Sequence, residues 1–443
     1  MYLTHLLRKR VEEEGPVRVG LIGAGKFGSM FLAQVPSSLG MVVPVIADLD
    51  PVQARSACYS AGWDKELIGK TRFIEDGQDL IAAEDVDVVV EATGKPRAGV
   101  FHAQKAIHEG KHVVMVNVEA DVLVGPALAR EAASAGVVYS MAYGDQPALI
   151  CELVDWARAC GFEVVAAGKG TKYLPSFHLS TPDTVWDYYG ITNQTAQAAR
   201  MNPQMFNSFL DGTKSAIEMA VVANATGLTA APDGLAFPPC GVEELAQILR
   251  PREVGGLLHH KEQVEVISSL NRNGSPVSRD LRWGVYVVVE APNEYTASCF
   301  SEYGLITDES GRYAATYKPF HLIGLELGIS ILSAELRGEP TGQSVGFTAD
   351  VIAVAKQDLV SGQVLDGEGG YTVWGKLMAA GESISLGGFP IGLTDGAKLL
   401  KDIPAGQMLR WADIEVKEDM ETVVLRRSME RTFRSECLKS NKH

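Results

Sequence analysis

Residues 17–28 decide the fold, and they read VRVGLIGAGKFG. The apolar run 17–22 predicts a buried strand. It is followed by Gly23, Gly25 and Gly28 in a Gly-x-Gly-x-x-Gly motif, and then by a helical segment. A strand, a glycine-rich turn and a helix in this order are the context that a dinucleotide-binding turn requires.

Each glycine of the motif has a physical task. Gly23 permits a tight turn, Gly25 lets the backbone approach a diphosphate, and Gly28 lets the helix pack closely on the strand. Because the first N–H groups of a helix are unpaired and carry partial positive charge, they favour an anion. The motif therefore predicts a dinucleotide site, in which Lys26 and Phe27 also line the cofactor.

Strands and helices alternate on the C-terminal side of the motif. Further strands are expected at 41–50, 86–94, 111–117 and 137–145, with helical stretches between them. This alternation predicts a parallel, doubly wound Rossmann sheet. Thr93 and Gly94 end one strand, where a loop lies beside the cofactor. Asn117 ends the next strand, and it either faces the nicotinamide ribose or the substrate, or caps its own backbone.

Asp48 lies 20 residues after Gly28 and is expected to accept hydrogen bonds from the adenosine ribose. An acid at this position favours NAD, because it repels the 2′-phosphate of NADP. Arg55 or Arg72 could still reach such a phosphate, so the residues alone leave NADP open.

The chain is long enough for three domains. We expect a Rossmann domain over 1–160, an α+β substrate domain over 161–344, and a small β-rich module over 345–443. The module contains a weak repeat, QDLVSGQVL at 357–365 and KDIPAGQML at 401–409. Its last 15 residues are rich in Arg, Lys and Ser, and we expect a loose end or an assembly arm there.

The segment 193–227 is expected to be helical. Asp211, Lys214 and Glu218 are spaced so that all three lie on one face of a helix, as a surface ion-pair ladder would. The residues around Lys214 are small and apolar, which favours a buried lysine that acts as an acid, a base or a proton shuttle.

Other polar residues could bind an anion. Lys169 and Lys172 lie in the glycine-containing stretch at the start of the second domain. They either bind a carboxylate or phosphate, or belong to a charged turn exposed to solvent. Lys318 and His321 lie in a second stretch of dense polar functionality.

The composition narrows the class of protein. The formal net charge of −15 argues against a nucleic-acid binder. The six cysteines include no Cys-x-x-Cys pair and show no metal-ligand spacing, which is typical of reduced thiols in a cytosolic protein. The N-terminus lacks the apolar run of a signal peptide, and no stretch approaches the roughly 18 apolar residues of a membrane span. We therefore expect a cytoplasmic protein without membrane partners.

The order GAGKFG, EATG, VVMVN and DGTKSAIEMA resembles the homoserine-dehydrogenase-like oxidoreductases. The tail, QDLVSGQVLDGEGGYTVWGKL with KDIPAGQML, resembles a SAF module. Together they resemble the deoxyxylulose-phosphate reductoisomerase-like (DRL) group. This resemblance implies an NADPH-dependent reductoisomerase that converts 1-deoxy-D-xylulose 5-phosphate to 2-C-methyl-D-erythritol 4-phosphate in isoprenoid precursor biosynthesis.

The chain departs from its relatives at some positions. Homoserine dehydrogenases usually carry Asn-Lys where this chain has Asn117-Val118, which argues against homoserine as the substrate. A C-terminal ACT domain is not found in the sequence, and neither is the Asp-x-Glu metal motif of the standard reductoisomerases.

The resemblance also implies roles for the candidate residues. Lys214 would be the proton shuttle or oxyanion donor, oriented by Asp211, and Glu218 or Asp211 could hold a divalent cation such as Mg or Mn. The remaining group would anchor the substrate phosphate: Lys169, Lys172, Lys318 and His321.

Two other classes stay open. One is a plain NAD(P)-dependent dehydrogenase of a hydroxy acid or sugar acid, in which the same lysines bind a carboxylate. The other is a cofactor-binding sensor without catalysis. In each case we expect a homodimer with a small-molecule ligand.

Overall fold

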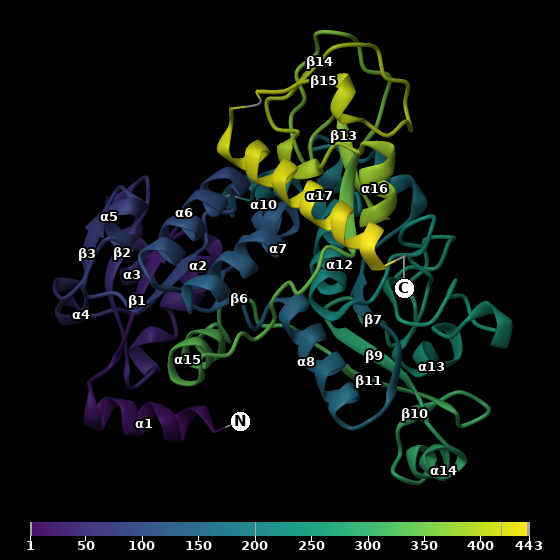
Figure 1. The fold of residues 1–443 in the computed structure, drawn as a ribbon, viewed down its shortest axis with the longest axis horizontal. Coiled ribbons are helices and arrows are strands. Elements are labelled where there is room, and N and C mark those ends of the chain that lie inside the picture. Colours follow the sequence, from purple (N-terminus) through teal and green to yellow (C-terminus); the bar gives the residue numbers. More distant parts are fainter. Residues whose placement is uncertain (1, 200, 418, 441–443) are drawn as a thin grey trace. The chain divides into compact units, whose positions relative to one another are not determined.

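The computed structural model describes residues 2–199, 201–417 and 419–440. It divides into two compact units (Figure 1). The first contains Met1–Glu152 and His321–Val345, and the second contains Leu153–Phe320 and Gly346–His443. Each unit is described by itself.

The first unit is built on a six-stranded parallel sheet with the strand order β3-β2-β1-β4-β5-β6. The strands are β1 (Val17–Ile22), β2 (Met41–Ala47), β3 (Arg72–Ile74), β4 (Val88–Glu91), β5 (His112–Met115) and β6 (Tyr139–Met141). The strand order reverses between β1 and β4, and ligands of such sheets bind outside the carboxyl ends of the strands at that point. The predicted doubly wound Rossmann sheet is confirmed.

Helices connect these strands. They are α1 (Leu3–Glu13), α2 (Lys26–Leu32), α3 (Pro51–Ser60), α4 (Lys65–Gly69), α5 (Gly77–Ile81), α6 (Pro96–His108) and α7 (Val118–Ala135), and α8 (Gln146–Ala159) crosses the boundary between the units. A later segment completes the first unit, because α15 (Gly328–Arg337) packs on α1 and places Leu327 and Ile331 in the core of the parallel sheet. The predicted domain boundaries stay a prediction. In the structure, residues 321–345 return to the first unit.

The second unit contains a five-stranded mixed sheet with the order β10-β11-β9-β7-β8. Its strands are β7 (Glu163–Thr171), β8 (Gln263–Ser268), β9 (Val285–Glu290), β10 (Ile306–Thr307) and β11 (Tyr313–Lys318). Its helices are α9 (Val185–Tyr189), α10 (Asn193–Ala198), α11 (Pro203–Leu210), α12 (Thr213–Thr226), α13 (Leu245–Ile248) and α14 (Glu294–Glu302). Helix α12 is almost entirely buried, because it packs against both β8 and the strands that follow at the C-terminus.

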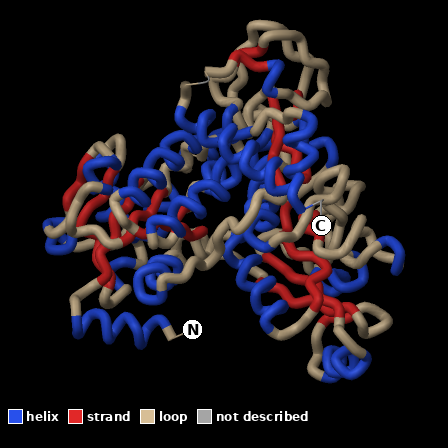
Figure 2. The backbone as a smooth tube through the Cα atoms, in the orientation of Figure 1, coloured by secondary structure: helices blue, strands red, loops and turns tan. Residues whose placement is uncertain are grey.

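The C-terminal part of the second unit is rich in short strands and loops (Figure 2). Its elements are the antiparallel pairs β12 (Ala349–Ala355) with β13 (Val373–Ala379) and β14 (Lys398–Leu399) with β15 (Ile414–Glu415), and the helices α16 (Ala380–Leu386) and α17 (Glu421–Ser440). The predicted architecture of a Rossmann sheet, an α+β domain and a β-rich module is confirmed.

The two repeat copies bind each other through reciprocal hydrogen bonds. Leu359 and Ile403 exchange both backbone bonds, at 2.8 and 2.9 Å between N and O. The carboxylate of Asp358 accepts from the N–H of Ala405 at 2.8 Å, and that of Asp402 accepts from the N–H of Ser361 at 2.7 Å. The repeat therefore forms one locally symmetric unit.

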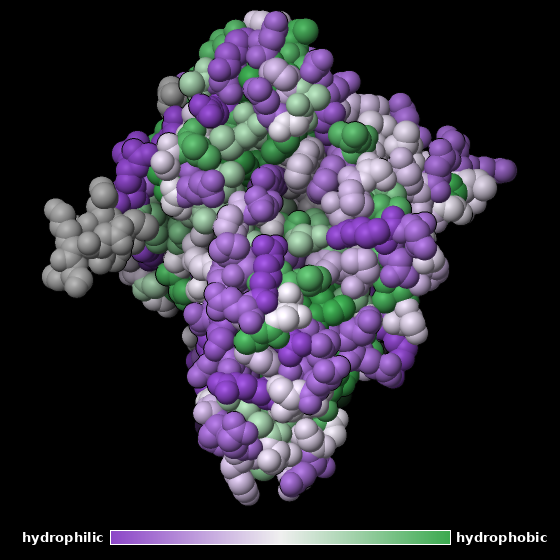
Figure 3. Space-filling model, turned by 90° about the vertical axis from the view of Figure 1, so that its right-hand side faces the viewer, coloured by the Kyte–Doolittle hydropathy of each residue, from purple (hydrophilic) through white to green (hydrophobic). Residues whose placement is uncertain are grey.

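The end of the chain differs from the expectation. Residues 429–440 belong to helix α17 rather than to a loose end, and residues 441–443 lie outside the described residues. The helix is anchored because Met429 and Phe433 are buried, and because the fully buried Arg426 pairs with Asp350 and Glu430. On the face drawn in Figure 3, hydrophilic residues dominate and hydrophobic ones form small scattered groups.

Candidate functional site

The glycine-rich turn between β1 and α2 has the geometry that the motif predicts. Gly23 has φ +96°, and a Cβ there would lie 2.7 Å from the carbonyl oxygen of Ala92. A Cβ at Gly28 would lie 2.3 Å from the carbonyl oxygen of Gly23, so only glycine fits. Gly25 caps α2 and has no atom within 4 Å of its Cβ position, which leaves room for a diphosphate. A dinucleotide therefore fits this turn, with Lys26 and Phe27 in the first helical turn.

Asp48 lies beside this turn at the end of β2. Its Oδ2 accepts a hydrogen bond from the N–H of Ala24 at 2.8 Å, and its Oδ1 accepts one from Asp50 at 2.9 Å. The carboxylate is partly exposed and is held where a ribose hydroxyl would meet it in a Rossmann site. Of the two arginines considered for a 2′-phosphate, Arg72 pairs with Asp85 at 2.5 Å, whereas Arg55 lies over the ring of Phe73.

The loop after β4 brings in a residue that sequence reasoning missed. Glu91 is fully buried, and its Oε1 accepts from the hydroxyl of Thr93 at 2.5 Å and lies 3.3 Å from Nδ1 of His102. Gly94 follows with φ +64°. The signal was the acid at the end of the apolar run 86–91, since a carboxylate buried in a strand needs partners.

Asn117 caps helix α7. Its Oδ1 accepts from the N–H of Ala120 at 3.2 Å, and its Nδ2 donates to the carbonyl of Lys95 at 2.9 Å. The capping interpretation is confirmed, and contact with cofactor or substrate stays a prediction.

In the second unit, the prediction that Asp211, Lys214 and Glu218 share one face of one helix is wrong. Helix α12 begins at Thr213, and Gly212 ahead of it has φ +88°, so Asp211 lies outside the helix. Lys214 is in the first turn and is partly exposed rather than buried.

Asp211 and Glu218 instead form two buried ion pairs with other lysines. The ammonium of Lys169 on β7 binds the carboxylate of Glu218, and both side chains are almost fully buried. Asp211, at the end of α11, pairs at 2.8 Å with Lys356, which follows β12. Each carboxylate is therefore held by a lysine from a different element.

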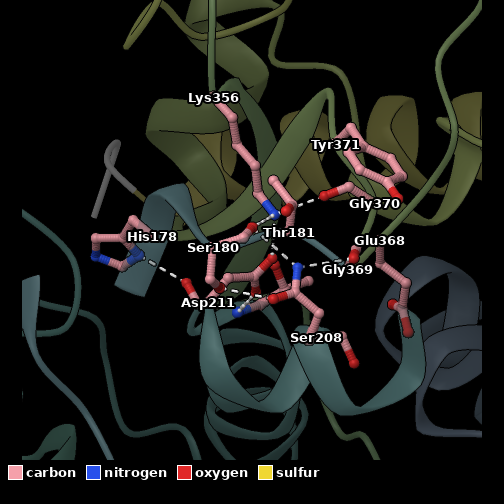
Figure 4. A network of polar contacts seen from close by, with 12 residues as sticks. His178, Ser180, Thr181, Ser208, Asp211, Lys356, Glu368, Gly369, Gly370 and Tyr371 are labelled. Atoms are coloured by element: carbon pink, nitrogen blue, oxygen red, sulfur yellow. Dashed lines mark hydrogen bonds and ion pairs between the residues drawn. The ribbon is translucent and has the colours of Figure 1, made fainter. Parts of the chain in front are cut away.

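Figure 4 shows the polar network around the second pair. The ammonium of Lys356 also donates to the carbonyls of Ser180 and Gly370, each at 2.8 Å. Oδ1 of Asp211 accepts from the N–H of Thr213 at 2.9 Å. Burial raises the pKa of Asp211, and the neighbouring ammonium of Lys356 opposes that rise. The network ties the start of α12 to the C-terminal module.

His178 adjoins this network and lines a cavity of about 280 Å³. Its Nδ1 bonds the carbonyl oxygen of Asp211 at 2.7 Å, its Nε2 lies 2.9 Å from the hydroxyl of Tyr173, and its ring stacks on Trp374. Burial lowers the pKa of His178, which favours the neutral imidazole. The ring is thus fixed on both sides and serves as a rigid cavity wall.

The predicted anion-binding lysines gather at one edge of the five-stranded sheet. Lys169 and Lys318 both pair in register with Val285, so their side chains share one face. Lys172 follows β7, and Arg282 lies ahead of β9. Lys169 is paired with Glu218, and the ammonium of Lys172 donates to the carbonyl of Tyr188 at 2.5 Å. Lys172, Lys318 and Arg282 are the other cations that we describe at this edge.

Arg282 was not singled out in the sequence, although it precedes a clear strand. The pKa of Lys172 is lowered by burial and then by the charge of Arg282, and both cations lie 5.8 Å from the ring centroid of Tyr189. Two like charges this close favour an anion between them. His321 begins the segment that belongs to the first unit.

A divalent cation does not fit the predicted carboxylates. Asp211 and Glu218 are each bound by a lysine ammonium. Within residues 2–199, 201–417 and 419–440, no group of three or more His, Cys, Asp or Glu side chains could hold a metal ion.

Glu265 gives the second unit a pH-dependent stability. It is buried on β8, and its Oε1 accepts from the N–H groups of Ala236 and Phe237, where Phe237 has φ +49°. Burial raises the pKa of Glu265 to about 7 from 4.5. Between these values the native state binds more protons than the unfolded state. Stability therefore falls as the pH rises, by about 3 kcal/mol in total.

We expect Glu265→Gln to remove this part of the pH dependence, because the amide does not titrate. The measurement is denaturant unfolding of both proteins at about pH 5 and about pH 8. Glu243→Gln, on the surface, is the control and should keep the wild-type dependence. An unchanged pH dependence in Glu265→Gln would contradict the assignment.

Two stretches of the chain match models of known protein families. Residues 20–141 match the model of the homoserine dehydrogenase NAD-binding domain, and residues 144–327 match the model of the catalytic domain of oxidoreductase DRL. Residues 20–141 are therefore similar to a NAD-binding domain of the homoserine dehydrogenase kind, and residues 144–327 are similar to a DRL-type catalytic domain. The predicted resemblance is confirmed to this extent, and the SAF module stays a prediction.

Curated relatives match over shorter stretches. Homoserine dehydrogenase from Neisseria gonorrhoeae is 34% identical over 111 residues, which are 23% of each chain. Inositol 2-dehydrogenase from Burkholderia vietnamiensis is 34% identical over 98 residues, which are 22% of this chain and 27% of that protein. The match spans about a quarter of the length of these relatives.

Among solved structures, a levoglucosan dehydrogenase in complex with NADH and L-sorbose is 16% identical, with a TM-score of 0.33, and the match covers 68% of this chain and 66% of that one. A myo-inositol dehydrogenase from Corynebacterium glutamicum is 14% identical, with a TM-score of 0.29, and the match covers 38% of this chain and 48% of that one.

Proposed function

We propose that this chain is an NAD(P)-dependent oxidoreductase that acts on a small hydroxy or keto compound bearing an anionic group. The observation that carries the proposal is the turn at Gly25, which is open at the N-terminus of α2 within a match to a NAD-binding domain. When bound, the nicotinamide cofactor would supply or accept a hydride. Asp48 would hold the adenosine ribose.

In this proposal the edge cations Lys172, Lys318 and Arg282 bind the anionic group of the substrate, because charge-assisted hydrogen bonds to carboxylate or phosphate are strong. Lys214 moves the proton of the reacting hydroxyl. It lies in the first turn of α12 and is partly exposed, as a group that meets a substrate must be.

Two substrate classes compete. The relatives named homoserine dehydrogenase and inositol 2-dehydrogenase support a plain dehydrogenase of a hydroxy acid or sugar acid. The match to the DRL catalytic domain supports the NADPH-dependent reductoisomerase that forms 2-C-methyl-D-erythritol 4-phosphate. The dehydrogenase is the better supported of the two.

One experiment separates them. The purified chain is incubated with NADPH and 1-deoxy-D-xylulose 5-phosphate, and in parallel with NAD⁺ or NADP⁺ and L-homoserine, myo-inositol or D-gluconate. Nicotinamide absorbance and product mass are followed. Methylerythritol phosphate identifies the reductoisomerase, and oxidation of a hydroxy compound alone identifies the dehydrogenase. Cofactor binding without turnover of the whole panel overturns the oxidoreductase proposal in favour of a sensor.

Two variants test the proposed division of labour with whichever substrate turns over. Lys172→Ala should raise KM on the order of tenfold or more with little change in kcat, because it removes a charge-assisted hydrogen bond to the distal anion. Lys214→Ala should lower kcat on the order of a hundredfold, because proton transfer is lost. Lys398→Ala, an exposed lysine, is the control. Turnover unchanged in Lys214→Ala would contradict its role.

The cellular setting remains a prediction of the sequence. None of the helices in the described ranges 2–199, 201–417 and 419–440 is long and apolar enough to cross a membrane. A cytoplasmic location and the absence of nucleic-acid partners are proposed on composition. A homodimer is proposed on the resemblance and on the apolar strand expected at 281–292.

A further inference from the structure

A groove of about 820 Å³ lies in the C-terminal module, and no step of the proposed reaction uses it. Its walls are helix α16, the turn 410–412 and the middle of helix α17, and the two helices lie side by side (Figure 1). The volume is in the range of small-molecule sites, about 300–1,000 Å³.

Four arginines line this groove, although the chain as a whole has a formal net charge of −15. They are Arg410, Arg427, Arg431 and Arg434. The one acid in the lining, Glu430, is already bound by Arg426 at 2.9 Å and by Arg427 at 3.1 Å. The groove therefore keeps a positive charge that its own walls do not neutralise.

The guanidinium groups differ in what they already bind. Arg427 lies 3.7 Å from the ring centroid of Trp411, which fixes its plane. Arg434 donates to the carbonyl of Ile384 at 3.0 Å and retains further N–H groups. Arg410 and Arg431 are exposed, and no acceptor for their side chains is recorded in the part of the chain that the structure describes. Several N–H donors thus converge on one space without an acceptor.

We propose that this groove is a second anion site, which binds a small molecule carrying two or more phosphate groups. Planar guanidinium forks bind phosphate oxygens in bidentate fashion, and several forks around one groove match several phosphates rather than one. A long polyanion such as nucleic acid is disfavoured, since it would extend over a chain of negative net charge. The site shares no lining residue with the sheet edge at Lys172, Lys318 and Arg282.

The test is isothermal titration of the full chain with inorganic pyrophosphate, compared with inorganic phosphate and with a DNA oligonucleotide. We expect pyrophosphate to bind more tightly than phosphate, with an affinity that falls as salt rises. Arg431→Ala and Arg410→Ala should each weaken pyrophosphate binding on the order of tenfold. Arg252→Ala, which removes an exposed charge from the same unit outside the groove, should leave it unchanged.

Both groove arginines are exposed, so their variants should fold, and circular dichroism checks this. Three results would overturn the proposal. One is the lack of a binding isotherm with pyrophosphate, and another is an equal loss of affinity in Arg252→Ala. The third is tighter binding of the oligonucleotide than of pyrophosphate. Pyrophosphate can also bind at the dinucleotide turn or at the sheet edge. The loss of affinity in Arg410→Ala and Arg431→Ala therefore assigns binding to the groove, whatever the outcome for the oxidoreductase proposal.

Discussion

Replacing Lys356 with methionine is expected to lower the free energy of unfolding by about 3–5 kcal/mol. The ammonium of Lys356 lies 2.8 Å from Oδ2 of Asp211, whose side chain is completely buried. Methionine fills similar space but leaves that carboxylate without its cation, and an uncompensated buried charge is costly. Denaturant unfolding measures the loss, and Lys376→Met, on the adjacent strand β13 and partly exposed, should lose far less.

The double variant Asp211→Asn with Lys356→Met shows whether the stranded charge is the cause. The amide oxygen of asparagine can still accept the hydrogen bond from Thr213, so the double variant should be more stable than Lys356→Met alone. The loss in Lys356→Met should also shrink at acidic pH, because burial raises the pKa of Asp211 and its protonation then removes the unpaired charge. Equal losses in the single and double variants would show that packing, not charge, is responsible.

The Rossmann unit could be predicted because its determinants are local. The three glycines, Asp48 and the alternating apolar runs lie within short stretches of chain, and each imposes its own backbone geometry. The returning segment 321–345 could not be predicted in this way. Its contribution to the first core, through Leu327 and Ile331, depends on packing between residues far apart in the sequence.

The prediction for the second unit was wrong at the turn that precedes helix α12. The i, i+3 argument assumed a continuous helix through Asp211, whereas Gly212 adopts φ +88° and the carboxylate bonds the N–H of Thr213. Asp-Gly-Thr is itself a turn signature, since aspartate bonds the backbone two residues on and glycine tolerates positive φ. That turn could therefore have been predicted from the sequence. The pairing of Asp211 with Lys356 could not, because the two residues are far apart in the sequence and no local pattern connects them.

The sheet edge and the arginine groove show the same limit. Lys169, Lys172 and Lys318 were predicted to bind an anion because lysine is cationic. Their common position at one edge, together with Arg282, depends on how β7, β9 and β11 pair, which the sequence does not show. The last 15 residues were expected to form a loose end or an assembly arm because they are rich in Arg, Lys and Ser. Burial of Arg426 between Asp350 and Glu430 shows how a charged helix is held when its partners lie elsewhere in the chain.

Replacing Gly25 with alanine is expected to weaken binding of the nicotinamide dinucleotide by about a hundredfold, or about 3 kcal/mol, without loss of stability. A Cβ at Gly25 meets no protein atom within 4 Å, and no positive φ strains the residue, so the fold should accept the methyl group. The same methyl group would occupy the space through which a diphosphate approaches the N-terminus of α2. Cofactor affinity by fluorescence titration and Tm by thermal unfolding are the two measurements.

Gly69→Ala is the matched control for this variant. Gly69 lies in the same unit, in helix α4, also has open space at its Cβ position, and is outside the dinucleotide turn. It should leave cofactor affinity unchanged and Tm equal or slightly higher, since alanine favours a helix over glycine. If Gly25→Ala binds the dinucleotide as tightly as Gly69→Ala does, the diphosphate does not approach the backbone at Gly25. The assignment of the site to this turn would then be wrong. A fall in Tm together with affinity would instead mean that Gly25 is needed for the turn itself.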